Sequence, residues 1–197
     1  KATDDPKRKV SLLRKEAKAR HKAGDDDGQV ACFEELLRLD PGDGDALKVV
    51  RDAFTRRRKL QPLLPLIAAW ARSIPLDGAS SDAPHATPPA KERARRLGEL
   101  GAFVLDELGN EQLARDTFEE ALGVDPDEGT SLLRLADIAW AARDDERALE
   151  LLDRIKTEQW PRDPVELAYR RARCSYALGR ADAQDRLRAV LRLAAKH

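Results

Sequence analysis

Two stretches of this chain repeat one pattern of residues at the same spacing. The first runs from Gly24 through Phe33 to Asp40-Pro41, and the second runs from Gly109 through Phe118 to Asp125-Pro126. A period built from helix, turn, helix and proline is typical of stacked helical arrays, in which each unit packs against its neighbours. Such arrays generally bind other molecules rather than transform them.

Apolar residues also recur at helical spacing. Leu132, Leu135, Ala136 and Ala139 lie at i, i+3, i+4 and i+7, which places them on one face of an α-helix. The chain has only 4 Phe, 3 Trp and 2 Tyr, whereas the good helix formers Ala, Leu, Arg and Glu are abundant. The pattern predicts an all-α chain of about five helix pairs, expected near 10–22 and 29–39, 45–57 and 62–72, 91–108 and 111–122, 130–142 and 146–156, and 164–178 and 182–195.

The predicted pairs divide the chain into four parts. We expect an N-terminal tail over 1–9, two helix pairs over 10–74, a loop over 75–90, and three helix pairs over 91–197 that end in a capping helix. The segment 75–90 is rich in Pro, Ser, Ala and Asp, with almost nothing to bury. It is interpreted as an inserted surface loop. Two alternative interpretations stay open, a hinge between two blocks of helix pairs and a loop that a partner orders.

The pattern resembles the tetratricopeptide repeat (TPR). The segment from about Arg95 to Pro126 matches best, because it carries the small, apolar and turn residues that the repeat expects: Ala102, Leu105, Gly109, Ala114, Phe118, Ala121 and Pro126. The resemblance implies an α-solenoid of antiparallel helix-turn-helix units that forms a right-handed superhelix.

Several positions depart from the repeat. Arg143 stands where a turn glycine is expected, Gln29 and Arg51 stand where small residues are expected, and Arg58-Lys59 occupies another turn. The single asparagine, Asn110, lies in a turn, so the Lys/Asn/Arg carboxylate clamp known from some TPR proteins is absent and recognition of a chaperone tail is not inferred.

TPR proteins typically bind peptides or partner domains in a concave groove lined by their first helices. Projection of the first helices predicts a groove that is basic near the N-terminus and rich in aromatics and arginine near the C-terminus. The predicted groove residues are Arg14, Lys18, Lys48, Asp137, Trp140, Tyr169, Arg173 and Tyr176. Tyr, Trp and Arg often anchor interfaces, and an acidic peptide with an apolar anchor would suit such a surface.

Simpler interpretations of these residues stay open. The aromatic residues could pack between helices, and the charges could form a solvated face. Phe103 faces the groove in one helical register and the core in another. Arg56-Arg57-Arg58-Lys59 is explained in part by the helix dipole, with an acidic partner or a phosphate site as the alternative.

Composition and motifs argue against most other functions. Charged residues make up 37% of the chain but cancel to a formal net charge of zero, which disfavours nucleic-acid binding. No apolar run is long enough to insert into a membrane. No zinc spacing, phosphate loop or nucleophile motif is present, and Ala23 occupies the first ligand position of the calcium-like run Asp25-Asp26-Asp27. We therefore expect no catalytic residues, metal or cofactor.

The favoured hypothesis is a non-catalytic scaffold for protein–protein interaction that binds a peptide or partner domain in the concave groove. We expect the chain to be a segment of a larger bacterial protein. A regulatory sensor attached to an effector domain is the first alternative. The second is self-assembly through terminal repeats, for which Leu187 and Leu191 supply an apolar stripe. Cys32 and Cys174 are interpreted as small core residues, which favours the cytoplasm, with export left open because the chain starts at Lys1 without methionine.

Overall fold

The computed structural model describes residues 5–76 and 87–195. Within these ranges the chain is helical and has no strand. The elements are α1 (Pro6–Lys22), α2 (Asp26–Leu39), α3 (Gly44–Arg56), α4 (Leu63–Arg72), α5 (Pro89–Asp106), α6 (Glu111–Val124), α7 (Gly129–Ala141), α8 (Asp145–Arg154), the short 3₁₀ helix η1 (Thr157–Gln159), α9 (Pro164–Ala177) and α10 (Ala183–Ala194).

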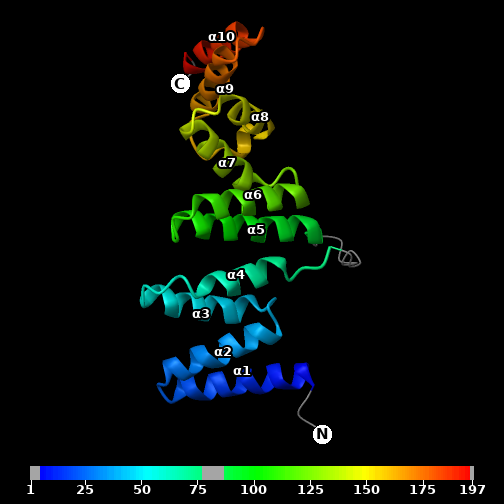
Figure 1. Ribbon diagram of the computed structural model, residues 1–197, viewed down its shortest axis with the longest axis vertical. Coiled ribbons are helices and arrows are strands. Elements are labelled where there is room, and N and C mark those ends of the chain that lie inside the picture. The colour runs from blue at the N-terminus through cyan, green and yellow to red at the C-terminus, as the bar shows by residue number, and fades with distance from the viewer. Residues whose placement is uncertain (1–4, 77–86, 196–197) are drawn as a thin grey trace.

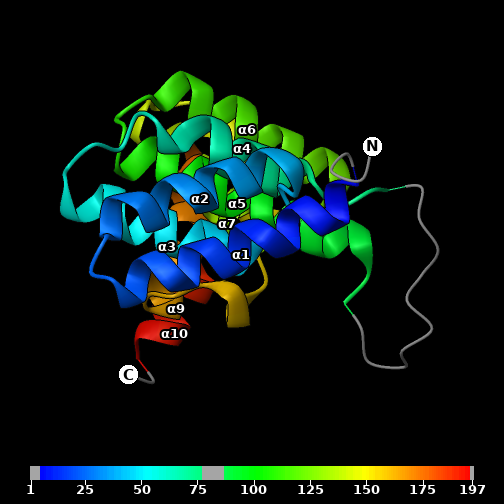
Figure 2. The same cartoon turned by 90° about the horizontal axis from the view of Figure 1, so that it is seen from below.

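The helices stack along one long axis, from α1 at one end to α10 at the other (Figure 1). Each odd-numbered helix packs against the even-numbered helix that follows it, and each such pair contacts the next pair along the chain. The view along the stack shows α1 at the near end, with no described helix in front of it (Figure 2). The predicted all-α solenoid of helix pairs is therefore confirmed.

The turns inside the helix pairs share one geometry. Gly24 and Gly109 have φ values of +75° and +65°, which a residue without Cβ adopts at little cost. The next residue caps the second helix, since Asp25 accepts a hydrogen bond from Gly28 N at 2.8 Å and Asn110 accepts one from Leu113 N at 3.1 Å. The repeated Gly-Asp and Gly-Asn dipeptides thus encode a left-handed residue followed by an N-cap.

Arg143 adopts the same turn without glycine. Its φ is +61°, and the next residue, Asp144, accepts a hydrogen bond from Arg147 N at 3.1 Å. The N-cap therefore supports the turn although its left-handed position carries a side chain.

Two helices begin inside segments that the sequence predicts as a tail or a loop. α1 starts at Pro6, inside the predicted tail over 1–9, because Asp5 caps it by accepting a hydrogen bond from Lys7 N at 3.0 Å. α5 starts at Pro89, inside the predicted loop over 75–90. In both cases a proline occupies the first helical position, where the missing N–H costs little. Residues 1–4 of the predicted tail, and most of the predicted loop (77–86), lie outside the described residues.

α4 and α5 contact each other directly, although the chain between them is long. The Arg96 guanidinium lies over the Trp70 ring, 4.5 Å from its centroid. Arg72 donates two hydrogen bonds to Glu120, at 2.9 and 2.5 Å. The second and third helix pairs therefore share a packed boundary.

The third helix pair has a close helix–helix contact at a glycine. Phe118 on α6 is fully buried and lies against Gly101 on α5. A Cβ added at Gly101 would lie 2.5 Å from Cε1 of that ring. Phe103 is only 4% exposed, so the register that places it in the core is the observed one.

We predict that Gly101→Ala lowers the free energy of unfolding by about 1–3 kcal/mol, because the new methyl group overlaps a ring that is held on all sides. Gly123→Ala in the same helix pair is the matched control. A Cβ there meets no heavy atom within 4 Å, so the change should be neutral or stabilise by about 0.5–1 kcal/mol. Urea denaturation of both variants measures the difference, and equal effects would show that the contact with Phe118 is unimportant.

Candidate ligand groove along the first helices

A groove opens between α3 and α5. Its first hollow is lined by Gly44, Leu47, Lys48, Arg51, Ile67, Trp70 and Glu99. A second hollow is lined by Arg51, Glu99, Ala102, Phe103, Asp106 and Glu107. Because Arg51 and Glu99 belong to both, the two hollows form one continuous surface, which we call the α3–α5 groove.

The α3–α5 groove combines an apolar floor with charged rims of opposite sign. Leu47 and Ile67 are buried beneath it, and α3 supplies Lys48 and Arg51 while α5 supplies the acidic side. The two hollows measure about 170 and 210 Å³, below the roughly 300–1,000 Å³ of small-molecule pockets. Each of these two hollows is therefore large enough for a single ligand side chain but too small for a cofactor.

The cations of the α3–α5 groove are available to a ligand. Among the described residues, Lys48 and Arg51 form no ion pair, and Arg51 lies 5.9 Å from the centroid of the Phe103 ring. The acidic rim is partly occupied, since Glu99 pairs with Arg95 and Asp106 with Arg134. The indole Nε1 of Trp70 is buried and has no hydrogen-bond partner in the described structure.

A third hollow continues the surface onto α7. It is lined by Gly129, Thr130, Leu133, Arg134, Asp137, Gln159, Pro161 and Arg162. Arg134 on α7 donates a hydrogen bond to Asp106 on α5 at 2.6 Å, and Asp106 belongs to the second hollow. The three hollows thus follow one another along the first helices α3, α5 and α7.

Asp137 joins α7 to the segment that precedes α9 and to α9 itself. Arg162 donates hydrogen bonds to its two carboxylate oxygens at 3.0 and 2.8 Å, and Arg170 donates one at 2.6 Å. Burial by itself would raise the pKa of Asp137, but the hydrogen bonds and positive charges of Arg162 and Arg170 outweigh it and hold that pKa below its ordinary value of 3.8. The carboxylate is therefore ionised at neutral pH.

Aromatic rings surround the same arginines. Arg170 lies 5.1 Å from the centroid of Trp140 and 5.3 Å from that of Trp160, and Arg162 lies 5.2 Å from Trp160. Trp160 is almost fully buried although it lies in a connector rather than in a helix. These contacts hold the connector between α8 and α9 against the first helices. We call Asp137, Trp140, Trp160, Arg162 and Arg170 the Asp137 cluster.

Arg173 extends the Asp137 cluster towards α8. Its guanidinium lies 4.6 Å from the centroid of Trp140 and 3.0 Å from a carboxylate oxygen of Asp145. The neighbouring Cys174 is buried, and its burial, followed by the hydrogen bond and charge of Asp145, raises the pKa of the thiol to about 11. Cys174 is thus an unreactive core residue, and Cys32 is likewise buried and free.

The structure places the sequence-predicted groove residues in four settings. Asp137, Trp140 and Arg173 meet one another around the Asp137 cluster, and Lys48 lines the α3–α5 groove. Arg14 pairs at 2.5 Å with Asp43, the N-cap of α3, and Lys18 lies exposed on α1. Tyr169 and Tyr176 are 49% and 69% exposed and lie outside the three hollows.

The sequence analysis missed residues that now define the site. Arg51 was noted only as a charge at a small-residue position, which was a usable signal for an exposed groove residue. Trp70 lies on α4, a second helix, so projection of the first helices could not include it. Trp160, Arg162 and Arg170 meet only because the α8–α9 connector folds back.

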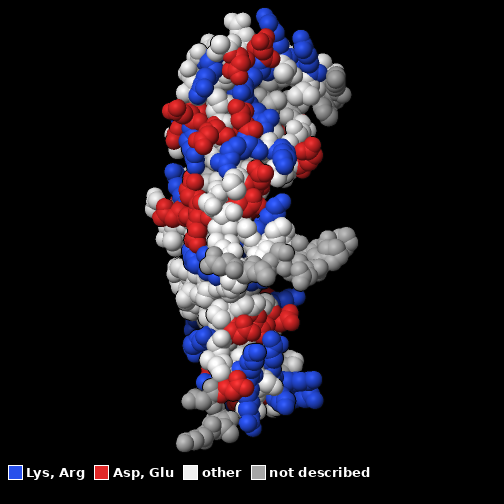
Figure 3. All heavy atoms as spheres, turned by 90° about the vertical axis from the view of Figure 1, so that its right-hand side faces the viewer, with Lys and Arg blue, Asp and Glu red and all other residues white. Residues whose placement is uncertain are grey.

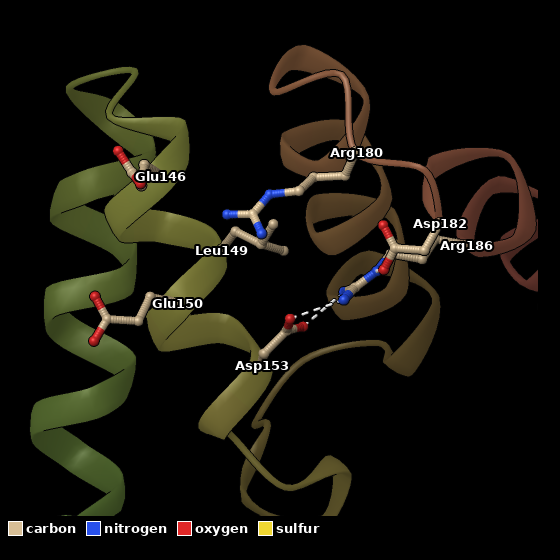
Figure 4. Close-up of a pocket in the computed structure, with 7 residues that line it drawn as sticks. All are labelled: Glu146, Leu149, Glu150, Asp153, Arg180, Asp182 and Arg186. Atoms are coloured by element: carbon tan, nitrogen blue, oxygen red, sulfur yellow. Dashed lines mark hydrogen bonds and ion pairs between the residues drawn. The ribbon is translucent and has the colours of Figure 1, made fainter.

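A further hollow lies between α8 and the turn that joins α9 to α10 (Figure 4). Arg186 donates hydrogen bonds to Asp153 at 2.7 and 2.9 Å and to Asp182 at 2.7 Å. Because much of its charge is paired internally, this hollow offers a ligand less than the α3–α5 groove does.

The third helix pair matches a known sequence family. Residues 97–128 match the tetratricopeptide repeat. The chain contains a TPR. The matched residues comprise most of α5, all of α6 and the turn that follows, which includes the contact between Gly101 and Phe118.

Solved structures agree with this fold. A crystal structure of MamA protein aligns with a TM-score of 0.50 and 16% identity, over 95% of this chain and 93% of that chain. The nearly identical TPR-like repeats of a candidate kinesin light chain from Podosopora anserina align with a TM-score of 0.47 and 17% identity, over 98% of both chains. At these identities the first likeness supports the fold alone. The search of curated protein sequences finds no match.

The described residues, 5–76 and 87–195, lack two further features. No group of three or more His, Cys, Asp or Glu side chains is arranged to hold a metal ion in this part of the chain. None of the described helices combines the length and the apolar character that crossing a bilayer requires.

We predict that Asp137→Asn lowers the free energy of unfolding at pH 7 by about 1–3 kcal/mol, because the largely buried Arg170 and the more exposed Arg162 lose a charged hydrogen-bond acceptor and keep only Glu166 as a counter-charge. A depressed carboxylate pKa contributes stability that is present above the unfolded-state value and is lost as pH falls through the folded-state value. The gap between parent and variant should therefore narrow as the pH falls below about 4. Denaturant titrations at a series of pH values measure it.

Asp185→Asn is the matched control, because its pair with Arg188 is highly exposed and should contribute at most about 1 kcal/mol. A gap for Asp137→Asn that stays constant down to pH 3 would contradict the assignment of a charged clamp.

Proposed function

We propose that this chain is a non-catalytic interaction module that binds an extended peptide segment of a partner protein along α3, α5 and α7. TPR proteins generally mediate protein–protein interaction, which supports the class of function. The observation that carries the site is the α3–α5 groove, where an apolar floor adjoins two cations that have no ion pair in the described structure.

The chemistry of the α3–α5 groove selects a kind of ligand. An apolar side chain would be buried against Leu47, Ile67 and the Trp70 ring, in a hollow large enough for one such group. An acidic residue beside that anchor would pair with Lys48 and Arg51, and Arg can bind a carboxylate through two parallel hydrogen bonds.

The residues of the Asp137 cluster have a different role in this proposal. Asp137, Trp140 and Arg173 already have partners inside the fold, so they position the wall of the third hollow rather than grip the ligand. Lys48 remains a direct contact. Tyr169 and Tyr176 are exposed enough to contact a ligand that continues onto α9.

We predict that a displayed library of random peptides selected on this chain enriches sequences with an apolar residue next to Asp or Glu. One enriched peptide, synthesised with a fluorophore, should bind at least tenfold more weakly to the variant Lys48→Glu with Arg51→Glu, a loss of about 1.4 kcal/mol. The reason is that two attractive charges become repulsive. Fluorescence anisotropy measures both dissociation constants.

The charge-matched control is Arg38→Glu with Arg192→Glu, two exposed arginines on second helices. It should leave binding unchanged, and all variants must first show the helicity and melting of the parent. Enrichment of peptides that bind parent and groove variant equally would refute the α3–α5 groove as the working surface.

A further inference from the structure

Ion pairs between successive helix pairs share one direction along the stack. In most of them the arginine belongs to the later pair or to the segment leading into it, and the carboxylate belongs to the earlier pair. Among the described residues these are Arg57–Asp27, Arg134–Asp106, Arg147–Glu119, Arg162–Asp137, Arg170–Asp137, Arg171–Asp153, Arg173–Asp145 and Arg186–Asp153.

Figure 4 shows one such pair, in which Arg186 of the last helix pair reaches back to Asp153 on α8. Two pairs run the other way, Arg14–Asp43 and Arg72–Glu120. At the boundaries between the third and fourth and between the fourth and fifth helix pairs, every ion pair among the described residues runs in the prevailing direction. The first boundary has one ion pair in each direction, and the second has only the reversed pair. Where the order holds, a helix pair has cations on the side that faces the preceding pair and carboxylates on the side that faces the next. Opposite charges thus meet at the internal boundaries.

α1 occupies the position where this order has no counterpart. It lies at the end of the stack, and no described helix covers its outer side (Figure 2). Lys15, Lys18 and Lys22 are exposed there and form no ion pair among the described residues. Its one acidic residue, Glu16, is already paired with Arg20.

The outer face of α1 therefore carries an excess of positive charge on a chain whose formal net charge is zero. Lys and Arg side chains gather at this end of the molecule in the space-filling view (Figure 3). Leu12, 52% exposed, lies four residues after Arg8 and three before Lys15, so it shares their face of the helix.

We propose that the outer face of α1 docks an acidic helical segment of a partner protein. The partner would supply the carboxylates that the earlier helix pair supplies at the internal boundaries, and Leu12 would give it an apolar contact. The surface is separate from the α3–α5 groove, so the two sites can be occupied independently.

Other occupants fit the outer face of α1 less well. α1 has no Phe, Tyr or Trp on which a base could stack, and its one imidazole, His21, lies beside Asp26. Leu12 is its only large exposed apolar residue, too little for membrane insertion. A second copy stacked end to end would bring α10, with the exposed Arg192 and with Arg188 already paired to Asp185, towards the cations of α1, and the charge of Arg192 disfavours that contact.

The test uses a fluorescein-labelled helical peptide of Glu and Ala, about as long as α1, which spans roughly 25 Å. Anisotropy should show binding that weakens with added salt. Lys15→Glu with Lys18→Glu should weaken it at least tenfold, and Lys15→Gln with Lys18→Gln should have a smaller effect in the same direction. Arg188→Glu with Arg192→Glu, the same change in charge at the opposite end, should leave it unchanged.

Several results would overturn the proposal. They are no binding of the acidic helix, equal weakening by the two charge-reversal variants, or equally tight binding of a proline-interrupted peptide of the same charge. Binding of duplex DNA or anionic vesicles in place of the peptide, or dimers that the α1 variant abolishes, would assign the face to another occupant. The groove variant Lys48→Glu with Arg51→Glu should bind this probe normally, so failure here is distinguishable from failure of the proposed function.

Discussion

Each helix pair in this chain has an apolar face that only a neighbouring pair can cover, and this requirement shapes the rest of the molecule. Leu151 and Leu152 on α8 are fully buried, and Leu167 on α9 is only 1% exposed. α8 packs directly on α9. Within a pair the same demand brings Phe118 against Gly101. Stacking is therefore the source of the core, and an extended surface beside the first helices is its consequence.

Charged side chains also connect successive helix pairs. The chain is rich in arginine and in carboxylates, and most arginines at the boundaries between pairs find a carboxylate across the boundary. An isolated exposed ion pair contributes little stability. Because most of these ion pairs run in one direction, however, helix pairs that stacked in the wrong order would bring like charges together. Lys48 and Arg51 in the groove and Lys15, Lys18 and Lys22 on α1 are among the cations that have no such partner in the described residues, so their charges are available to other molecules.

The sequence was informative about features that depend on local spacing. Gly24 and Gly109 belong to the repeated turn pattern and have positive φ values, because one residue type and its immediate neighbours decide such a turn. It was less informative about the groove. Trp140 and Arg173 were predicted to face a ligand, yet each has partners inside the fold that lie about 25 to 35 residues away in the chain or on another helix. Helical projection shows which side a residue faces, but it does not show whether another element covers that side.

By itself, then, the sequence determined the helices, their pairing and the TPR-like stacking, since these follow from apolar periodicity, turn glycines, N-caps and prolines within single segments. Only the tertiary structure decided which charged and aromatic side chains remain available. The α8–α9 connector brings Trp160 and Arg162 over α7 and occupies Asp137, whereas α4 brings Trp70 beside Lys48 and Arg51 and leaves a hollow there. The physical reason is that a charged or aromatic side chain is available to a ligand only if no other side chain of the fold already contacts it. Those contacting residues are distant in the chain, so only the packing of the whole stack shows where they lie.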